Sequence, residues 1–194
     1  MARAHVLADS TIKISIDTSK ALIAREAVHL GARMINDVTA GLLDPSIFAV
    51  AAEFNVPMIL MHMNGDPSVM QEAPVYTDVV KQVRNHLQER VAAARAAGVS
   101  TVYVDPGIGF GKTLEHNLEL LKNLDALADL ADGIVLGISR KRFLGTITGI
   151  ENPADRDTVT AFMHALLWNS GVHMIRVHDV PIHALLRSLA TRLA

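Results

Sequence analysis

The chain has 194 residues, which suits one domain over residues 1–194 with a sizeable core. Half of the residues are hydrophobic and only 4% are aromatic, so we expect an aliphatic core. The net charge of -2 argues against nucleic-acid or membrane partners, and the lack of cysteine excludes disulfides and zinc–thiolate sites. Neither a transmembrane stretch nor a signal-peptide core is evident, so we expect a cytoplasmic globular protein.

Short apolar runs alternate with helical patterns six times along the chain. The strands are expected at 12–17, 34–37, 57–62, 102–105, 134–139 and 174–179. The helices are expected at 20–30, 44–54, 76–97, 114–131, 155–169 and 182–193, with Thr18 or Ser19 capping the first and Asp155 the fifth. Strict alternation predicts an α/β fold in which helices cover a parallel sheet.

Every expected strand ends in polar residues. In chain order these are Asp17, Asn36, His62, Asp105, Ser139, and then Arg176 with His178. Parallel α/β folds place their chemistry at the carboxyl ends of the strands. Arg176 and His178 are two positions apart, so on a strand they would face the same side. With Lys141 in the preceding loop, they predict a pocket for an anion.

The segment from Asp105 to Thr113 follows a buried strand and carries three glycines in five residues. Glycine permits positive φ and a close approach of the backbone to a ligand. The segment matches neither a Walker loop, because Gly107 is one residue too close to Gly111, nor a dinucleotide fingerprint, because Lys112 replaces a glycine. A structural turn and a ligand loop both remain open for this segment alone.

Structural interpretations exist for the other residues too. Asp17, Asn36 and Asp105 are common at turns, and a histidine on an apolar strand, such as His62, is usually a buried core residue. The basic run 140–142 is compatible with a solvated face, and the loop at 63–74 with a functional or a disordered segment. The nine histidines show no ligand spacing for a metal.

Taken together and in this order, the motifs resemble the dihydropteroate synthase family of pterin-binding barrels. They are Ser-Ile-Asp-Thr at 15–18, Ile-Asn-Asp-Val at 35–38, Leu-Met-His-Met at 60–63, Asp-Pro-Gly-Ile-Gly-Phe-Gly-Lys at 105–112, Ser-Arg-Lys-Arg-Phe-Leu-Gly at 139–145 and Arg-Val-His-Asp at 176–179. The resemblance implies a TIM-type (β/α)8 barrel and a transferase of folate biosynthesis. That enzyme condenses 6-hydroxymethyl-7,8-dihydropterin diphosphate with p-aminobenzoate to 7,8-dihydropteroate and diphosphate, with Mg2+.

The resemblance also implies residue roles. It assigns the pterin to Asp17, Asn36, Met61, Asp105 and Lys141, the p-aminobenzoate side to Phe110 and Ser139, the diphosphate to Arg176 and His178, and catalysis to Lys141, Arg176 and His178. No enzyme nucleophile is needed, because an electron-rich dihydropterin can support a cation at its methylene carbon as diphosphate departs. Positioning and charge stabilisation are then the main tasks of the protein.

Compared with that family, two strands and most of two helices should precede residue 12. We therefore expect a partial TIM (β/α)8-type barrel with six βα units, the first two units missing, and open sheet edges at 12–17 and 174–179. The family's metal-binding asparagine lies in the missing part, so no metal ligand is expected in this chain.

Three functional hypotheses follow. The first is the synthase, with small-molecule substrates and, as is typical of the family, a homodimer. The second is a non-catalytic pterin-binding remnant without the magnesium and p-aminobenzoate loops. The third, a methyl-transferring folate barrel, is disfavoured because a diphosphate leaving group explains the cationic motifs at 139–142 and 176–179 and a methyl donor does not.

Overall fold

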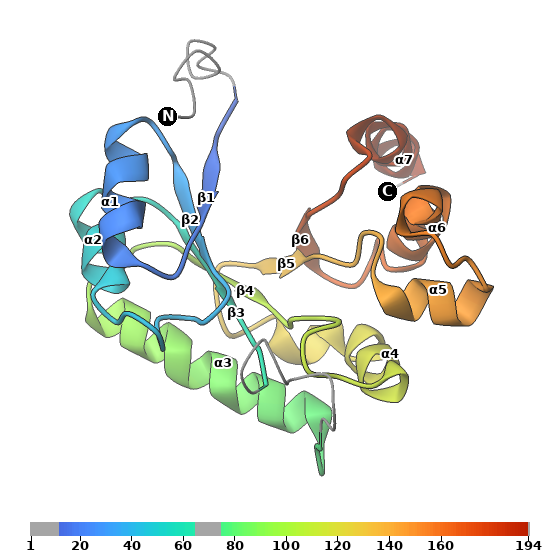
Figure 1. Cartoon of the computed structure of the whole chain (residues 1–194), viewed down its shortest axis with the longest axis horizontal. Coiled ribbons are helices and arrows are strands. Elements are labelled where there is room, and N and C mark those ends of the chain that lie inside the picture. Colours follow the sequence, from blue (N-terminus) through green and yellow to red (C-terminus); the bar gives the residue numbers. More distant parts are fainter. Residues whose placement is uncertain (1–11, 65–74, 194) are drawn as a thin grey trace.

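Six parallel strands form one sheet in the computed structural model, which describes residues 12–64 and 75–193. Their order is the order of the chain, so each strand lies beside its sequence neighbour. The sheet curves into a half-barrel with its helices outside (Figure 1). The strands are β1 (Ser15–Asp17), β2 (Met34–Asp37), β3 (Met58–Met61), β4 (Val102–Asp105), β5 (Ile134–Leu136) and β6 (Val172–Ile175).

Helices follow each strand on the outer face of the half-barrel (Figure 1). None of those in the described ranges combines the length and the apolar character that crossing a membrane requires. They are α1 (Ala21–His29), α2 (Ile47–Glu53), α3 (Val79–Ala96), α4 (Leu114–Lys122), α5 (Arg142–Thr148), α6 (Asp157–Leu166) and α7 (Val180–Leu193), with 3-10 turns η2 (Leu124–Leu127) and η3 (Pro153–Arg156).

The two faces of the sheet differ, as a period of two along each strand requires. Leu60, Val104 and Leu136 are fully buried and belong to the core between sheet and helices. Their neighbours Ile59 and Val135 line the inner side of the half-barrel, where they border a cavity of about 970 Å³. The outer face of the sheet thus packs against the helices in an aliphatic core, as the composition predicted, and its inner face borders the cavity.

The first and the last strand each pair on one side within the described ranges. β1 pairs with β2 from Ser15 to Asp17, and β6 pairs with β5. The expected open edges at these two strands are therefore present in this structure. The two strands are joined at their carboxyl ends, where Nη1 of Arg176, directly after β6, donates to Oδ2 of Asp17, the last residue of β1, at 2.9 Å.

Most element boundaries differ from the sequence prediction by a few residues, and three differences are larger. β6 begins at Val172 and ends at Ile175, so Arg176 and His178 follow the strand instead of alternating along it. The helix predicted at 114–131 ends at Lys122, and a 3-10 turn follows. The helix α5 is not among the predicted helices, since the stretch after the basic run 140–142 carries Gly145 and Gly149. Gly145 is required there because a Cβ would lie 2.6 Å from the Ile150 carbonyl oxygen.

The predicted helix caps at Thr18, Ser19 and Asp155 are wrong. The N-cap of α1 is Lys20, and the Ala21 N–H donates to Asp44 Oδ2 at 2.7 Å, from the loop between β2 and α2. The Asn152 side chain caps η3, and α6 begins without a side-chain cap. Part of the loop predicted at 63–74, residues 65–74, lies outside the described residues.

We expect Leu60→Ala to lower the free energy of unfolding by about 2–5 kcal/mol, because its buried side chain would leave a cavity in the aliphatic layer. The control is Leu166→Ala at a position that is 80% exposed, where the change should stay within about 0.5 kcal/mol. Urea unfolding followed by circular dichroism measures both. Equal losses in the two variants would contradict this account of the core.

Candidate functional site

The carboxyl ends of the six strands, with the residues directly after them, form one edge of the half-barrel, which we call the rim. Asp17, Asn36 and Arg176 line the wall of the inner cavity at this edge. Asp17 and Arg176 are 159 positions apart in the chain and are joined by the ion pair at 2.9 Å. The fold therefore brings its first and its last strand to the same cavity.

Asn36 and Asp37 are neighbours with opposite roles. The fully buried Asp37 accepts hydrogen bonds from the Thr39 and Gly41 N–H groups, at 2.9 and 2.7 Å, and from the Thr39 hydroxyl. Its carboxylate is used by the turn after β2. Asn36 is buried as well, but its amide nitrogen has no hydrogen-bond partner among the described residues. A buried donor without a partner is costly, so this amide is suited to an acceptor on a ligand.

Asp105 ends β4 and is buried beside Arg176. Its Oδ1 accepts from the Gly107 N–H at 2.8 Å. The two side chains flank Gly137, where a Cβ would lie 3.8 Å from Asp105 Oδ2 and 3.5 Å from Arg176 Nε. Burial raises the pKa of the Asp105 carboxyl, while the Gly107 N–H and the cations of Lys141, Arg176 and Lys112 act against this rise.

A pocket of about 280 Å³ carries the positive charge of the rim. It is lined by Gly137, Ser139, Lys141, Arg176, Val177 and His178. The three cationic or ionisable residues expected to bind an anion therefore lie around one pocket, although no strand alternation brings them there. Ser139 holds the His178 ring, since its Oγ lies 2.8 Å from Nδ1 and accepts from the His178 backbone N–H at 3.2 Å.

Lys141 connects this pocket with the glycine-rich loop. Its Nζ lies 3.8 Å from the ring centroid of Phe110, which is a close cation–π contact. Burial lowers the pKa of Lys141 to about 8; Asp105 raises it and Arg176 lowers it further. The ammonium is therefore positive at neutral pH and loses its charge in the mildly alkaline range.

Met61 lies apart from the residues above. It pairs with Asp105 across β3 and β4, but it is buried and lines a different cavity of about 390 Å³ together with Met63 and His86. The residues singled out from the sequence are thus spread over separate hollows rather than one. Arg176 joins two of these hollows, because it borders both the inner cavity and the cationic pocket.

Arg140 does not add to the anion pocket. Its guanidinium binds both carboxylate oxygens of Asp157, at 2.8 and 2.6 Å, and its φ is +61°. The buried Arg156 donates to the Arg140 carbonyl at 3.0 Å and to the Ile150 carbonyl at 2.9 Å. These two arginines shape the turn that presents Lys141, a role that the short basic run 140–142 alone did not indicate.

Lys112 was also missed, although it ends the glycine-rich motif. It is only 4% exposed, and its Nζ contacts His62 Nδ1 at 3.0 Å and the carbonyl oxygens of Gly107 and Phe110 at 2.9 and 3.0 Å. Burial lowers its pKa to about 7, with Asp105 acting in the opposite direction. The sequence signal for Lys112 was its place after Gly111 at the end of the loop, but the glycine spacing does not match a Walker loop.

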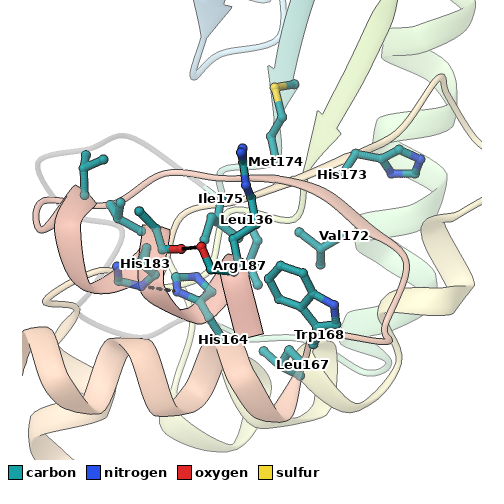
Figure 2. A pocket seen from close by; sticks show the side chains of 14 residues that line it. Leu136, His164, Leu167, Trp168, Val172, His173, Met174, Ile175, His183 and Arg187 are labelled. Atoms are coloured by element: carbon teal, nitrogen blue, oxygen red, sulfur yellow. Dashed lines mark hydrogen bonds between the residues drawn. The ribbon is translucent and has the colours of Figure 1, made fainter. Parts of the chain in front are cut away.

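A further cavity of about 530 Å³ lies between β6, α6 and α7 (Figure 2). It is mainly apolar, with Trp168, Leu167 and Val172 on its wall, and His164 and His183 hydrogen-bonded to each other at 2.9 Å. None of the nine residues assigned a role from the sequence lines it. The rim is therefore the candidate functional site.

A parallel half-barrel with polar side chains gathered at the strand ends defines an α/β protein of the TIM-barrel type. The model of the family described as "Pterin binding enzyme" matches residues 4–178, and the chain belongs to this family.

Known relatives and solved structures agree with this assignment. The chain is 43% identical over 172 residues to a dihydropteroate synthase of Streptococcus pyogenes serotype M6, which is 87% of this chain and 62% of the relative. It is 39% identical over 184 residues to that of Synechocystis sp., covering 94% and 64%. It thus spans less than two thirds of these curated relatives.

The fold is similar to solved dihydropteroate synthases. The structure from Thermus thermophilus in complex with 4-aminobenzoate has a TM-score of 0.92 and 40% identity, over 98% of this chain and 74% of that one. The same enzyme in complex with 6HMPPP has a TM-score of 0.91 and 39% identity, covering 98% and 76%.

We expect Gly107→Ala to destabilise the protein more than Gly149→Ala. Both glycines have positive φ, at +66° and +74°, so both variants carry the backbone strain of about 1–2 kcal/mol. Only at Gly107 would the new Cβ meet another atom, the His62 carbonyl oxygen at 1.8 Å, whereas nothing lies within 4 Å of Gly149. Thermal unfolding measures the difference, and equal melting temperatures would refute the close packing of this loop.

Proposed function

We propose that the chain is a dihydropteroate synthase, which joins the pterin of 6-hydroxymethyl-7,8-dihydropterin diphosphate to p-aminobenzoate and releases diphosphate. One observation carries this proposal: Arg176 borders both a cavity with hydrogen-bonding walls and a pocket of positive charge. A substrate that combines a polar heterocycle with an anionic tail matches this pair of hollows. The similarity to synthases solved with 4-aminobenzoate and with 6HMPPP supports the same substrates.

The pterin is proposed to bind to Asp17, Asn36, Asp105 and Lys141. Met61 is left out of this proposal, because it lines a different cavity together with Met63 and His86. Carboxylates accept hydrogen bonds from ring amino and N–H groups, and charge-assisted bonds of this kind are the stronger ones. The buried amide nitrogen of Asn36 would donate to a ring acceptor and so gain the partner that it lacks among the described residues. These groups fix the orientation of a flat heterocycle.

The diphosphate is proposed to lie in the cationic pocket, where Lys141 and Arg176 offset its charge and His178 adds a hydrogen bond. As the methylene C–O bond breaks, the electron pair leaves with the diphosphate and the dihydropterin supports the positive charge. The amine of p-aminobenzoate, bordered by Phe110 and Ser139, then forms the C–N bond and releases a proton. The protein acts by positioning and by electrostatic stabilisation, without a covalent intermediate.

Mg2+ is implied by the resemblance, but the described residues do not fit a metal held by the protein. No group of three or more His, Cys, Asp or Glu side chains within 12–64 and 75–193 could hold a metal ion. We therefore assign no metal ligand and derive no step through Mg2+.

The proposal extends to the domain organisation, the correspondence of the βα units and the oligomeric state. The residues 1–194 are proposed to form one domain, and the six βα units to correspond to the last six of an eight-unit barrel. The 74% coverage of the Thermus structure supports this correspondence, because it is close to the share that six of eight units would give. A homodimer is proposed from the family alone.

The proposal is tested by incubating the purified chain with the pterin diphosphate and p-aminobenzoate. The expected result is 7,8-dihydropteroate with one diphosphate per product. Binding of the pterin diphosphate without any product would favour the non-catalytic pterin-binding alternative. Neither binding nor product would refute both.

In that assay, Arg176→Ala and Lys141→Ala should each lower kcat/KM at least about tenfold, which is about 1.4 kcal/mol of transition-state stabilisation. The reason is the loss of a positive charge beside the departing diphosphate. Lys122→Ala, an exposed lysine at the end of α4, is the matched control and should leave the rate unchanged. Rates near the unmodified value in both rim variants would remove these residues from the mechanism.

The activity should also fall as the pH rises through about 8. Burial lowers the pKa of Lys141 to about 8, so the ammonium is charged below that pH and neutral above it. The Lys141→Arg variant keeps its charge, so its alkaline limb should move to higher pH. A profile of kcat/KM for the pterin diphosphate from about pH 6 to 10 measures this. If kcat/KM falls over the same alkaline pH range in both proteins, the group that loses its proton there is not Lys141.

A further inference from the structure

Lys112 is a buried cation that the proposed mechanism does not use. Its Nζ contacts three acceptors, which are His62 Nδ1 and the carbonyl oxygens of Gly107 and Phe110. An ammonium group has three N–H donors, one for each of these acceptors. Burial and the neighbouring Lys112 and His86 keep the pKa of His62 far below its ordinary value, so the His62 ring is neutral and can accept. In its charged form, which prevails below the pKa of about 7, Lys112 thus donates all three N–H groups inside the protein and leaves no donor for a ligand.

Two of these contacts join the glycine-rich loop to the lysine at its end, since the Gly107 and Phe110 carbonyls both accept from Lys112 Nζ. The Gly107 carbonyl accepts both from Lys112 and from the Phe110 N–H at 3.0 Å, which makes a tight turn. Positive φ at Gly107, Gly109 and Gly111 lets the carbonyls turn inward to meet the ammonium. On the other side, the Tyr76 hydroxyl donates to the Gly111 carbonyl at 3.1 Å.

The loop held in this way carries groups of the candidate site. Its Gly107 N–H binds Asp105, and its Phe110 ring lies under the Lys141 ammonium. Gly107 also lies so close to the His62 carbonyl that no Cβ fits between them. The position of Phe110 relative to Lys141 therefore depends on a loop whose inward carbonyls share one buried ammonium.

We propose that Lys112 is a positioning residue: its ammonium holds the loop 107–111 in the shape that fixes Phe110 against Lys141, and so sets the affinity for the aromatic amine substrate. The identity of that substrate rests on the proposed function. The fixing of the loop does not, because it follows from contacts within the protein.

The first test is hydrogen exchange of the loop amides, which requires no substrate. Lys112→Met keeps an unbranched side chain that is one atom shorter, but removes its charge and donors. We expect the Gly107 and Phe110 amides to exchange about tenfold faster in this variant, with the α3 amides unchanged. Lys122→Met on the surface is the matched control and should leave all of these rates unchanged. Unchanged loop amides in Lys112→Met would overturn the proposal.

If Lys112→Met does not fold, Lys112→Gln provides the second variant, since its amide retains donors at a shorter reach. A folded Lys112→Gln protein with faster loop exchange supports the proposal, and one with unchanged exchange overturns it. Failure of both variants to fold also overturns it, because Lys112 would then be needed for the whole fold and not for the loop.

The second test separates positioning from a general structural role. In Lys112→Met, the KM for p-aminobenzoate should rise about tenfold while the KM for the pterin diphosphate changes less than about threefold. Equal changes in both, or a fall in kcat alone, would contradict a role through Phe110. If the unmodified chain makes no dihydropteroate, the proposed function fails by itself, and the exchange comparison still decides whether Lys112 fixes the loop.

Discussion

The parallel pairing of six sequential strands is the constraint on which the site depends. It places every carboxyl end on the rim, and the curvature of the sheet brings β1 and β6 to the same cavity. The ion pair between Asp17 and Arg176 joins these ends, but both side chains are about half exposed, so it contributes at most about 1 kcal/mol. The sheet, with its buried aliphatic layer, holds the geometry, and the ion pair adds little to it.

At the rim, one residue of each adjacent polar pair binds other protein groups and the other lines a cavity. Asp37 binds the backbone of its own turn while Asn36 keeps a donor without a partner among the described residues. Arg140 is bound by Asp157, and the next residue, Lys141, lines the pocket. In each pair one side chain builds the turn that presents the other. The positive charge of the pocket thus comes from Lys141 and Arg176, whereas the charge of Arg140 is offset by Asp157.

The sequence located all six strands, although the bounds of β5 and β6 differ from the prediction, because apolar runs and the polar residues that follow them are local patterns. β4 was predicted at the residues where it lies, and Lys141, Arg176 and His178 were predicted to share a pocket. The rest depends on contacts between distant residues. Asp44 binds the first turn of α1 from 23 positions away, and Lys112 meets His62 across 50 positions. No local pattern could reveal such partners, and the glycines of α5 concealed a helix whose packing requires one of them.

The amide of Asn36 has a consequence for selectivity. A buried donor without a partner among the described residues costs on the order of 1–3 kcal/mol, and an incoming ring removes that cost only if it presents an acceptor at the right place. A carbocycle of the same size and flatness would leave this cost in place and gain nothing from the amide. The cavity would therefore discriminate by gain: of two compounds with equal shape, the one that presents the acceptor binds more tightly.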